Sequence, residues 1–325
     1  MNILIRSRIL VVLLVPTPTW TAAAERQERQ LPGRQVKVAA ICIGMGRAAE
    51  HDARLKLALD HLQTAGRQGV DIACLTEDFA GTTPEPVPGP TTGAVAQSAR
   101  ENKMWVICHV RELATGKRYN TAVLIDRQGN VAGRYRKVYP WFGERSVPGR
   151  KGVQVFQTDF GRVSILTCFD SNFAELWHQA DVLDAEIVFW LSGGGGGVWL
   201  NAYCTLHDYY AVSVGSGQIV DCTGENITRV ERPRPRQFIA TLDLDRTFVH
   251  GNFNTSKIKR MLDEHQGKIE LERHYRVENW YLLRSIKPGV RVRDLLKQYG
   301  IETLRKYRNR SRKQIDEARR LEKEI

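Results

Sequence analysis

The 325-residue sequence has only six cysteines, and none stands in a Cys-x-x-Cys pair or in a Cys/His spacing typical of zinc sites. A zinc centre is therefore not expected, and so few cysteines in a long chain do not make a disulfide scaffold. Cys42, Cys74 and Cys108 lie in apolar, strand-like runs, where burial as thiols is the simpler expectation. Cys204 and Cys222 could pair, and the sequence leaves that open.

Apolar runs long enough to cross a bilayer are also lacking. The run at residues 9–15 is too short to span one, and it follows Arg6 and Arg8 and precedes three alanines at 22–24. This order is typical of a secretory signal peptide with a small-residue cleavage site. We expect residues 1–24 to be a signal peptide, with an uncleaved anchor or a mistranslated upstream region as the alternative. The mature chain should then be exported, periplasmic or extracellular, and without a transmembrane span.

Acidic residues are fewer than basic ones, 36 against 48, which gives a net charge of +12. Residues 291–325 alone contain twelve basic and six acidic residues. Basic runs can bind nucleic acid or anionic lipid. Here, however, charges of both signs alternate beside apolar residues such as Leu295 and Leu304, which favours a solvated helix face. A nucleic acid partner is not expected.

The five consecutive glycines at 193–197 lack the Gly-Lys-Ser/Thr ending of a phosphate-binding loop. They follow an apolar run at 186–191 that is typical of a strand. We interpret them as a mobile loop over a pocket.

Strands and helices alternate along most of the chain. Apolar runs typical of strands occur at residues 35–44, 70–76, 104–110, 120–125, 131–137, 155–156, 163–167, 186–191, 211–217 and 237–244. Helical patterns occur at 51–65, 93–102, 198–210 and after Cys168. This alternation predicts an α/β layered core, and two strand–turn–strand units add antiparallel pairs, so mixed sheets are expected. Residues from about 250 onward are charged and helical, and resemble an extension or an oligomer arm.

Glu77, Lys137 and Cys168 share one feature, because each follows an apolar or β-rich run at its C-terminal end. In α/β sheets that edge is where ligands bind. A thiol, a carboxylate and an ammonium group converging there would suit acyl transfer, with a nucleophile, a proton carrier and an oxyanion stabiliser. Taken singly, each has a plainer explanation, as a buried core thiol, a strand-end cap or a surface charge. Spacing alone does not decide between these interpretations.

The motifs that surround these three residues decide between the interpretations. The stretches Leu-Thr-Glu77-Asp-Phe, Tyr-Arg-Lys137-Val-Tyr-Pro-Trp and Leu-Thr-Cys168-Phe-Asp occur in this order, with Asn120-Thr-Ala between the first two. Together they resemble the carbon-nitrogen hydrolase (nitrilase) superfamily, and the resemblance covers roughly residues 36–245.

The resemblance implies a role for each matching position. Glu77 would be the general base, Lys137 the oxyanion-stabilising cation and Cys168 the nucleophile. Glu144 matches the second glutamate of the family, which positions the lysine and the substrate, and the backbone N–H of Phe169 would complete the oxyanion hole. The implied fold is a four-layer α-β-β-α sandwich that usually dimerises through its helical layer. Neither a metal nor an organic cofactor is implied.

Within the family, the sequence is closer to amidases than to nitrilases. Nitrilases carry Cys-Trp-Glu at the nucleophile, whereas this chain has Cys168-Phe-Asp, and the stretch from Asp170 to Trp177 resembles that of aliphatic amidases. Ala174 stands where the family usually has proline, and the five glycines replace a more structured segment. These departures leave the identity of the substrate open, but they do not affect the three residues expected to carry the reaction.

We therefore expect an α/β fold, the four-layer sandwich with mixed sheets, in a carbon-nitrogen hydrolase domain at 25–249, followed by a basic, largely helical extension at 250–325. The predicted function is thiol-dependent hydrolysis of an amide or carbamoyl C–N bond through a thioester. The expected partners are a small amide or carbamoyl substrate and further copies of the chain, as a homodimer or larger homo-oligomer. The alternatives are a nitrilase, or a catalytically idle binding protein.

Overall fold

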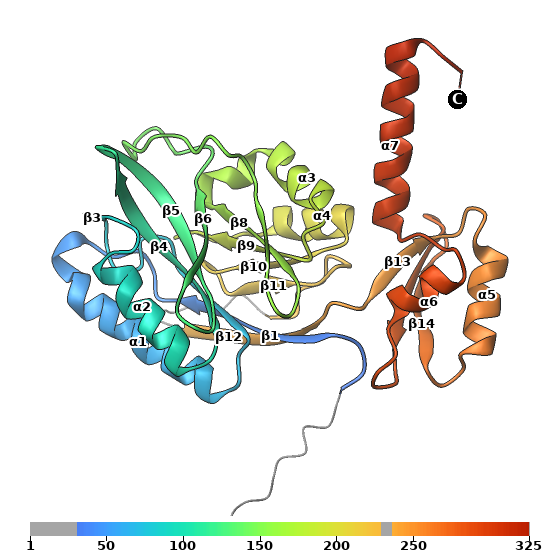
Figure 1. Ribbon diagram of the computed structural model, residues 1–325, viewed down its shortest axis with the longest axis horizontal. Coiled ribbons are helices and arrows are strands. Elements are labelled where there is room, and N and C mark those ends of the chain that lie inside the picture. The colour runs from blue at the N-terminus through green and yellow to red at the C-terminus, as the bar shows by residue number, and fades with distance from the viewer. Residues whose placement is uncertain (1–30, 229–235, 325) are drawn as a thin grey trace, which may run out of the picture. The chain divides into compact units, whose positions relative to one another are not determined.

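Two β-sheets packed face to face make up most of the computed structural model (Figure 1). The structure describes residues 31–228 and 236–324. The signal peptide predicted at 1–24 lies outside these residues and stays a prediction. Residues 31–325 belong to one unit of the chain.

The larger sheet is built from strands that the sequence predicted as apolar runs. Its order is β12 (Arg236–Asp243), β1 (Gln35–Cys42), β2 (Ile72–Leu75), β4 (Trp105–Ala114), β5 (Lys117–Ile125) and β6 (Val131–Arg136), with the short β3 (Pro84–Glu85) paired to β4. Strands β1, β2 and β4 are parallel, whereas β12, β5 and β6 add antiparallel pairs. The sheet is mixed, as predicted.

The smaller sheet has the same mixed character. Its order is β11 (Gln218–Val220), β10 (Tyr210–Ser213), β9 (Ile187–Leu191), β8 (Arg162–Thr167) and β7 (Val155–Gln157). Its central strands β8, β9 and β10 run parallel, and β7 and β11 pair antiparallel at its edges. Strand β6 is thus an edge of one sheet and β7 an edge of the other.

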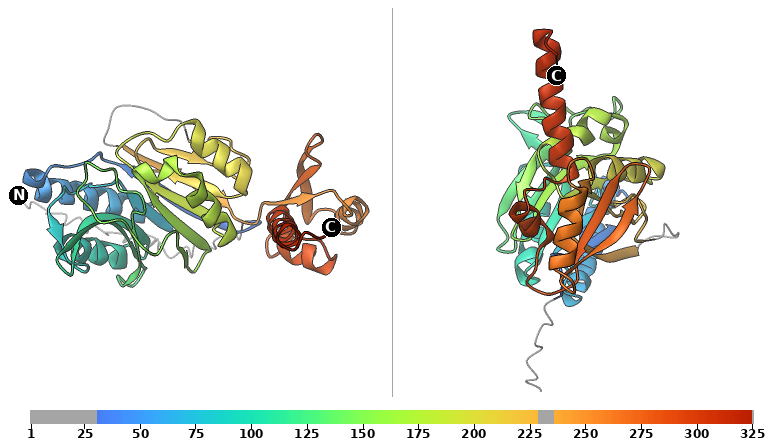
Figure 2. Two further views of the ribbon diagram at one scale, coloured as in Figure 1. Left: turned by 90° about the horizontal axis from the view of Figure 1, so that it is seen from above. Right: turned by 90° about the vertical axis from the view of Figure 1, so that its right-hand side faces the viewer.

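Side-chain alternation explains the layers. On β4, Trp105 and Ile107 join the core between the two sheets, whereas Val106 and Cys108 join the core on the opposite face, with α1 (His51–Arg67) and α2 (Pro90–Glu101). Helices α3 (Ala174–Val182) and α4 (Val198–His207) pack their apolar residues into the core of the smaller sheet. The predicted α-β-β-α sandwich is confirmed (Figures 1 and 2).

The remaining elements follow β12 in the chain. They are β13 (Thr247–His250), α5 (Thr255–Glu264), β14 (Ile269–Tyr275), β15 (Trp280–Ser285), α6 (Val292–Gln298) and α7 (Leu304–Leu321). All of them except α7 contribute to a separate apolar cluster, whereas Leu304 of α7 joins the core of the sandwich. The three strands form an antiparallel sheet in the order β13-β15-β14, which was not predicted from the sequence (Figure 2, orange). The predicted boundary at 249/250 falls within β13.

Two further expectations concern cysteines and membranes. Cys204 and Cys222 are both buried and are free thiols in this structure, so the pairing that the sequence left open is not formed.

Within the described part of the chain, no helix combines the length and the apolar character that crossing a bilayer would require.

Candidate active site

The three strand ends singled out in the sequence converge. Glu77 follows β2, Lys137 follows β6 and Cys168 follows β8, and the first two side chains are almost completely buried. The Nζ of Lys137 lies 3.3 Å from Oε1 of Glu77 and also donates a hydrogen bond to Oε1 of Glu144. The thiol of Cys168 is in hydrogen-bonding contact with Glu77 and with Ser192. One polar centre between the sheets therefore holds all four predicted side chains.

A tight turn at the end of β8 presents the thiol. Cys168 has a φ of +44°, in the left-handed region that non-glycine residues rarely adopt, and it begins the 3-10 helix η2 (Cys168–Asn172). The indole Nε1 of Trp190 donates to the carbonyl oxygen of Cys168 at 2.9 Å and holds the turn from β9. Phe169, whose backbone N–H was predicted to serve an oxyanion hole, is the next residue of this turn.

Asp170 anchors the turn to the strand that leads to the lysine. Its Oδ2 accepts hydrogen bonds from the backbone N–H of Thr167 at 3.0 Å and from the hydroxyl of Tyr135 at 2.7 Å. Its Oδ1 accepts from the backbone N–H of Tyr139 at 2.9 Å. Burial raises the pKa of Asp170 to about 6, although these donors act in the opposite direction. Because Tyr135 and Tyr139 flank Lys137, Asp170 fixes the lysine relative to the thiol.

Opposite charges keep Lys137 protonated. Burial by itself would lower its pKa, but the negative charge of Glu77, followed by the contributions of Cys168 and Glu144, outweighs burial and raises it. The reverse holds for Glu144, where burial would raise the pKa and the hydrogen bond from Lys137 is the main reason that it is lowered. Lys137 and Glu144 therefore form a charged pair inside the site.

The Cys168 thiol is different, because its neutral form is favoured. Burial, followed by the negative charge of Glu77, raises the pKa of the Cys168 thiol to about 11, while Lys137 and Ser192 act to lower it. At neutral pH the sulfur is protonated. A thiol in this state could attack a substrate only if a base removed its proton, and the carboxylate in contact with it is Glu77.

Asn120, in β5, joins the two glutamates. Its Nδ2 donates hydrogen bonds to Oε1 of Glu77 and to Oε2 of Glu144, both at 2.9 Å. Since both amide hydrogens are used, its Oδ1 must accept a hydrogen bond, and it faces Nε2 of His109. His109 therefore carries a proton on Nε2 and fixes the orientation of the amide.

Arg111 extends this network along β4. Its Nε donates to Oδ1 of Asp78 at 2.8 Å, and its Nη1 donates to Oε2 of Glu144 at 3.1 Å. Burial would lower the pKa of Arg111, but Asp78, followed by Glu144 and Glu77, raises it. Glu144 thus receives hydrogen bonds from a lysine, an asparagine and an arginine.

His109 and Arg111 were not identified from the sequence, and Asn120 was treated only as part of a motif. A signal for the first two was present, because polar side chains interrupt an otherwise apolar run at alternate positions and so lie on one face of a strand. Asn120 gives no comparable signal, since the two glutamates to which it donates lie 43 and 24 positions away in the sequence.

The predicted glycine loop adjoins the site. Ser192, which contacts the thiol, immediately precedes the five glycines, and its Oγ accepts a hydrogen bond from the backbone N–H of Gly194 at 3.0 Å. The N–H of Gly197, at the start of α4, donates to Oε1 of Gln218 at 2.9 Å. The mobility of this loop stays a prediction.

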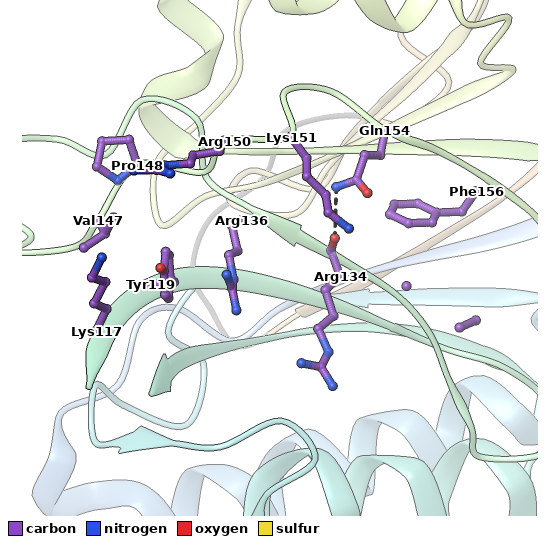
Figure 3. Close-up of a pocket in the computed structure, with 12 residues that line it drawn as sticks. Lys117, Tyr119, Arg134, Arg136, Val147, Pro148, Arg150, Lys151, Gln154 and Phe156 are labelled. Carbon is purple, nitrogen blue, oxygen red and sulfur yellow. Dashed lines mark hydrogen bonds between the residues drawn. The ribbon is translucent and has the colours of Figure 1, made fainter. Parts of the chain in front are cut away.

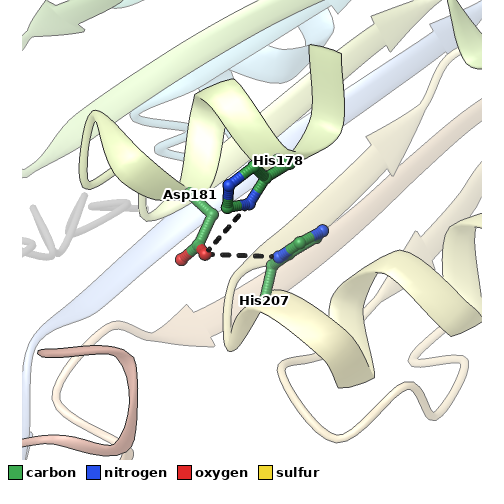
Figure 4. A group of neighbouring side chains, drawn as sticks. All are labelled: His178, Asp181 and His207. Atoms are coloured by element: carbon green, nitrogen blue, oxygen red, sulfur yellow. Dashed lines mark ion pairs between the residues drawn. The ribbon is translucent and has the colours of Figure 1, made fainter. Parts of the chain in front are cut away.

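One group within the described residues has the composition of a metal site. His178, Asp181 and His207 each offer one ligand atom, and these atoms lie within 4.8 Å of one another (Figure 4). Oδ2 of Asp181 lies 3.3 Å from Nδ1 of His207 and 3.8 Å from Nδ1 of His178. However, Arg305 pairs with Oδ1 of the same aspartate, and Arg312 contacts the His178 ring. Because these cations would repel a metal ion, we interpret the group as an anchor for α7.

Relatives of known activity match about half of the chain. A formamidase from Bacillus cereus (strain B4264) is 28% identical over 179 residues, which covers 48% of this chain and 53% of the relative. A formamidase from Bacillus anthracis (strain CDC 684 / NRRL 3495) is 27% identical over the same length. The chain spans about half the length of the curated relatives that it matches.

Solved structures share the fold. One is a mutant of the Nesterenkonia AN1 amidase, a protein from the nitrilase superfamily. It superposes with a TM-score of 0.58 at 20% sequence identity, and the match covers 66% of this chain and 93% of that one. Nit3 of Saccharomyces cerevisiae, a member of the nitrilase superfamily, also gives a TM-score of 0.58, at 18% identity, covering 69% and 95%. The sequence model of the family described as carbon-nitrogen hydrolase matches residues 37–203, from β1 to α4. This match covers every predicted catalytic position, and the chain belongs to the carbon-nitrogen hydrolase family.

Proposed function

We propose that the protein is an amidase that hydrolyses a small amide or carbamoyl C–N bond through a thioester on Cys168. The observation that carries the proposal is the contact of one carboxylate, Glu77, with both the thiol and the Nζ of Lys137. Acyl transfer needs a proton acceptor beside the nucleophile and a fixed positive charge where the oxyanion develops. This arrangement supports both requirements.

In the acylation step, the sulfur of Cys168 attacks the amide carbon and its proton passes to Glu77. A C–S bond forms, and the carbonyl oxygen becomes an oxyanion that Lys137 and the backbone N–H of Phe169 stabilise. When the intermediate collapses, the C–N bond breaks and Glu77 returns the proton to the leaving nitrogen, which departs as ammonia or an amine.

In the deacylation step, Glu77 takes a proton from a water molecule that attacks the thioester carbon. A C–O bond forms, the C–S bond breaks, and the departing sulfur of Cys168 takes the proton back from Glu77. Glu144 does not enter this proton path, because Lys137, Asn120 and Arg111 all donate to it. We assign it to positioning Lys137.

The relatives support amides as the substrate class. The matching Bacillus proteins are formamidases. A structure of the Nesterenkonia amidase records acrylamide added at its active-site cysteine. We therefore propose a short, uncharged amide as the first substrate to try. A nitrile is the second candidate, and release of a carboxylic acid and ammonia directly from a nitrile would identify it.

The experiment compares the wild type with Cys168→Ala on a panel of simple amides, carbamoyl amino acids and nitriles, with ammonia detection. We expect the wild type to release ammonia from at least one amide, and the variant to lose turnover while keeping its circular dichroism spectrum. Cys222→Ala is the matched control, because Cys222 is a buried thiol outside the network. Retained turnover in Cys168→Ala would refute the mechanism, and a wild type inactive on the whole panel would favour the idle binding protein.

Export and self-association are part of the same proposal. Cleavage after residue 24 would be seen as the mass of the secreted chain. A homodimer or larger homo-oligomer would be seen by size-exclusion chromatography with light scattering. A chain retained in the cytoplasm would contradict export. A monomer at micromolar concentration would contradict self-association.

A further inference from the structure

A cavity lies beside β6, the strand that leads to Lys137. It has a volume of about 690 Å³ and is lined by β6, the start of β5, Phe156 of β7 and the segment at 147–154 (Figure 3). Neither Glu77, Lys137, Glu144 nor Cys168 is among its lining residues. The volume is in the range of small-molecule sites.

The lining is strongly basic. Twelve residues line the cavity and none is acidic, whereas the basic ones are Lys117, Arg134, Arg136, Arg150 and Lys151. Because 48 of the 325 residues of the chain are Lys or Arg, about two would be expected in a lining of this size. Concave surfaces of one charge sign concentrate ions of the opposite sign.

The described part of the chain neutralises only part of this charge. Arg134 and Arg136 form ion pairs with a single carboxylate, that of the buried Glu112. Within residues 31–228 and 236–324, no carboxylate forms an ion pair with any of three other lining residues, Lys117, Arg150 and Lys151. Three cations in this cavity thus have no counter-charge among the residues that the structure describes.

The cavity also has fixed features. The guanidinium of Arg136 lies 3.8 Å from the ring centroid of Tyr119, a cation–π contact that restrains it. The amide of Gln154 is held by a hydrogen bond of 3.1 Å from its Nε2 to the carbonyl oxygen of Arg134 (Figure 3). Arginine and lysine donors on a restrained frame are the usual means of binding phosphate and carboxylate groups.

We propose that this cavity binds a small polyanion with at least two phosphate or carboxylate groups. A small ligand fits better than a nucleic acid, because the basic residues line one hollow and not an extended track. The lining residues at 147–154 also belong to the segment at 138–154, which carries Glu144. In that segment, the N–H of Gly149 donates to the carbonyl oxygen of Lys137, and the N–H of Val147 donates to that of Arg118, both at 2.8 Å.

The test measures binding of inorganic pyrophosphate and, separately, citrate to the full chain by isothermal titration calorimetry. The two probes distinguish a phosphate site from a carboxylate site, and binding of either supports the proposal. Lys151→Glu should raise the Kd at least about tenfold, because it reverses one of the uncompensated charges. Lys313→Glu is the control, since it makes the same change at an exposed lysine of α7, and its Kd should stay within about twofold.

Four results would overturn the proposal. The first is the absence of saturable binding of both probes, and the second is an equal loss of affinity in Lys151→Glu and Lys313→Glu, as expected for a diffuse charge effect. The third is tight binding of a single-stranded oligonucleotide that pyrophosphate does not displace. The fourth is loss of binding in Cys168→Ala, which should bind the probes as the wild type does, because such a loss would place the anion in the active site instead.

Discussion

Glu77 acts on Cys168 in two opposing ways. Its negative charge raises the pKa of the thiol and so keeps the sulfur protonated at rest. In the proposed reaction, the same carboxylate removes that proton. A single residue therefore suppresses the free thiolate and makes the sulfur nucleophilic when a substrate is present.

Glu77→Gln should separate these effects. Loss of the charge should lower the pKa of Cys168 below about 11, so the thiolate fraction at pH 8 should grow and iodoacetamide should alkylate the thiol about tenfold faster. Amide turnover should fall by about two orders of magnitude or more because the base is lost. The rates would be measured by mass spectrometry and ammonia release.

The wild type is the reference for this comparison. Its alkylation rate should rise steadily with pH through the alkaline range, since its thiol pKa is about 11. The other five cysteines are buried and should react slowly. If Glu77→Gln is alkylated at the wild-type rate or more slowly, Glu77 does not control the proton on the sulfur.

Residues that carry motifs could be singled out from the sequence. The structure brings together Glu77, Lys137, Cys168 and Glu144, which were identified from motif context, and their catalytic roles stay a proposal. The residues that hold them, such as Asn120 and His109, could not be assigned roles. Their roles depend on hydrogen-bond partners distant in sequence, and those become visible only when the strands are paired.

The segment at 138–154 is the element that decides the geometry of Glu144. It returns to β6 at Gly149, whose N–H donates to the carbonyl oxygen of Lys137 at 2.8 Å. A Cβ at this position would overlap the backbone carbonyl of Arg136. The close approach of the two backbones therefore requires glycine.

Gly149→Ala should push the segment away from β6 and move Glu144 relative to Lys137. We expect kcat for amide hydrolysis to fall roughly tenfold or more, and the free energy of unfolding to fall by about 1–3 kcal/mol. Both would be measured on purified protein, the second by urea denaturation.

Gly93→Ala is the matched control. Gly93 lies in α2, and a Cβ there would meet open space. This variant should keep full activity and gain about 0.5–1 kcal/mol, since alanine favours helices. Equal activity losses in the two variants would contradict the role of the close contact at Gly149.

Element prediction was best where hydrophobic periodicity was strong. The strand β9 and the helix α1 were found nearly at their observed bounds, whereas β4 extends four residues beyond its predicted end. The sheet of β13, β14 and β15 was missed, because β14 alternates charged residues with few apolar ones and resembles a solvated helix in composition. Its strand character comes from pairing with β15.

At the scale of the whole molecule, Arg305 ties α7 to the sandwich. Its guanidinium donates to the backbone carbonyls of Ala185, His207 and Asp208, and forms an ion pair with Asp181 at 2.9 Å. The residue is 7% exposed. The basic residues near the C-terminus, predicted as a solvated helix face, therefore include one that is buried and structural.

Arg305→Ala should lower the free energy of unfolding by about 3 kcal/mol, because it leaves a buried carboxylate and several carbonyls without their donor. The measurement is urea denaturation of the full chain. Arg320→Ala removes an exposed arginine of the same helix that pairs with the exposed Glu317, and should cost less than about 0.5 kcal/mol. Similar losses in both variants would show that Arg305 is not an anchor.

The left-handed backbone at Cys168 has a consequence for the stability of the fold. A side chain at a φ of +44° strains the folded state by about 1–2 kcal/mol, and glycine would relieve that strain. Cys168→Gly would also remove a partly buried side chain and make the unfolded chain more flexible, so these effects and the relief of strain offset each other. The turn therefore presents the sulfur at a local cost in backbone free energy, which the rest of the fold has to supply.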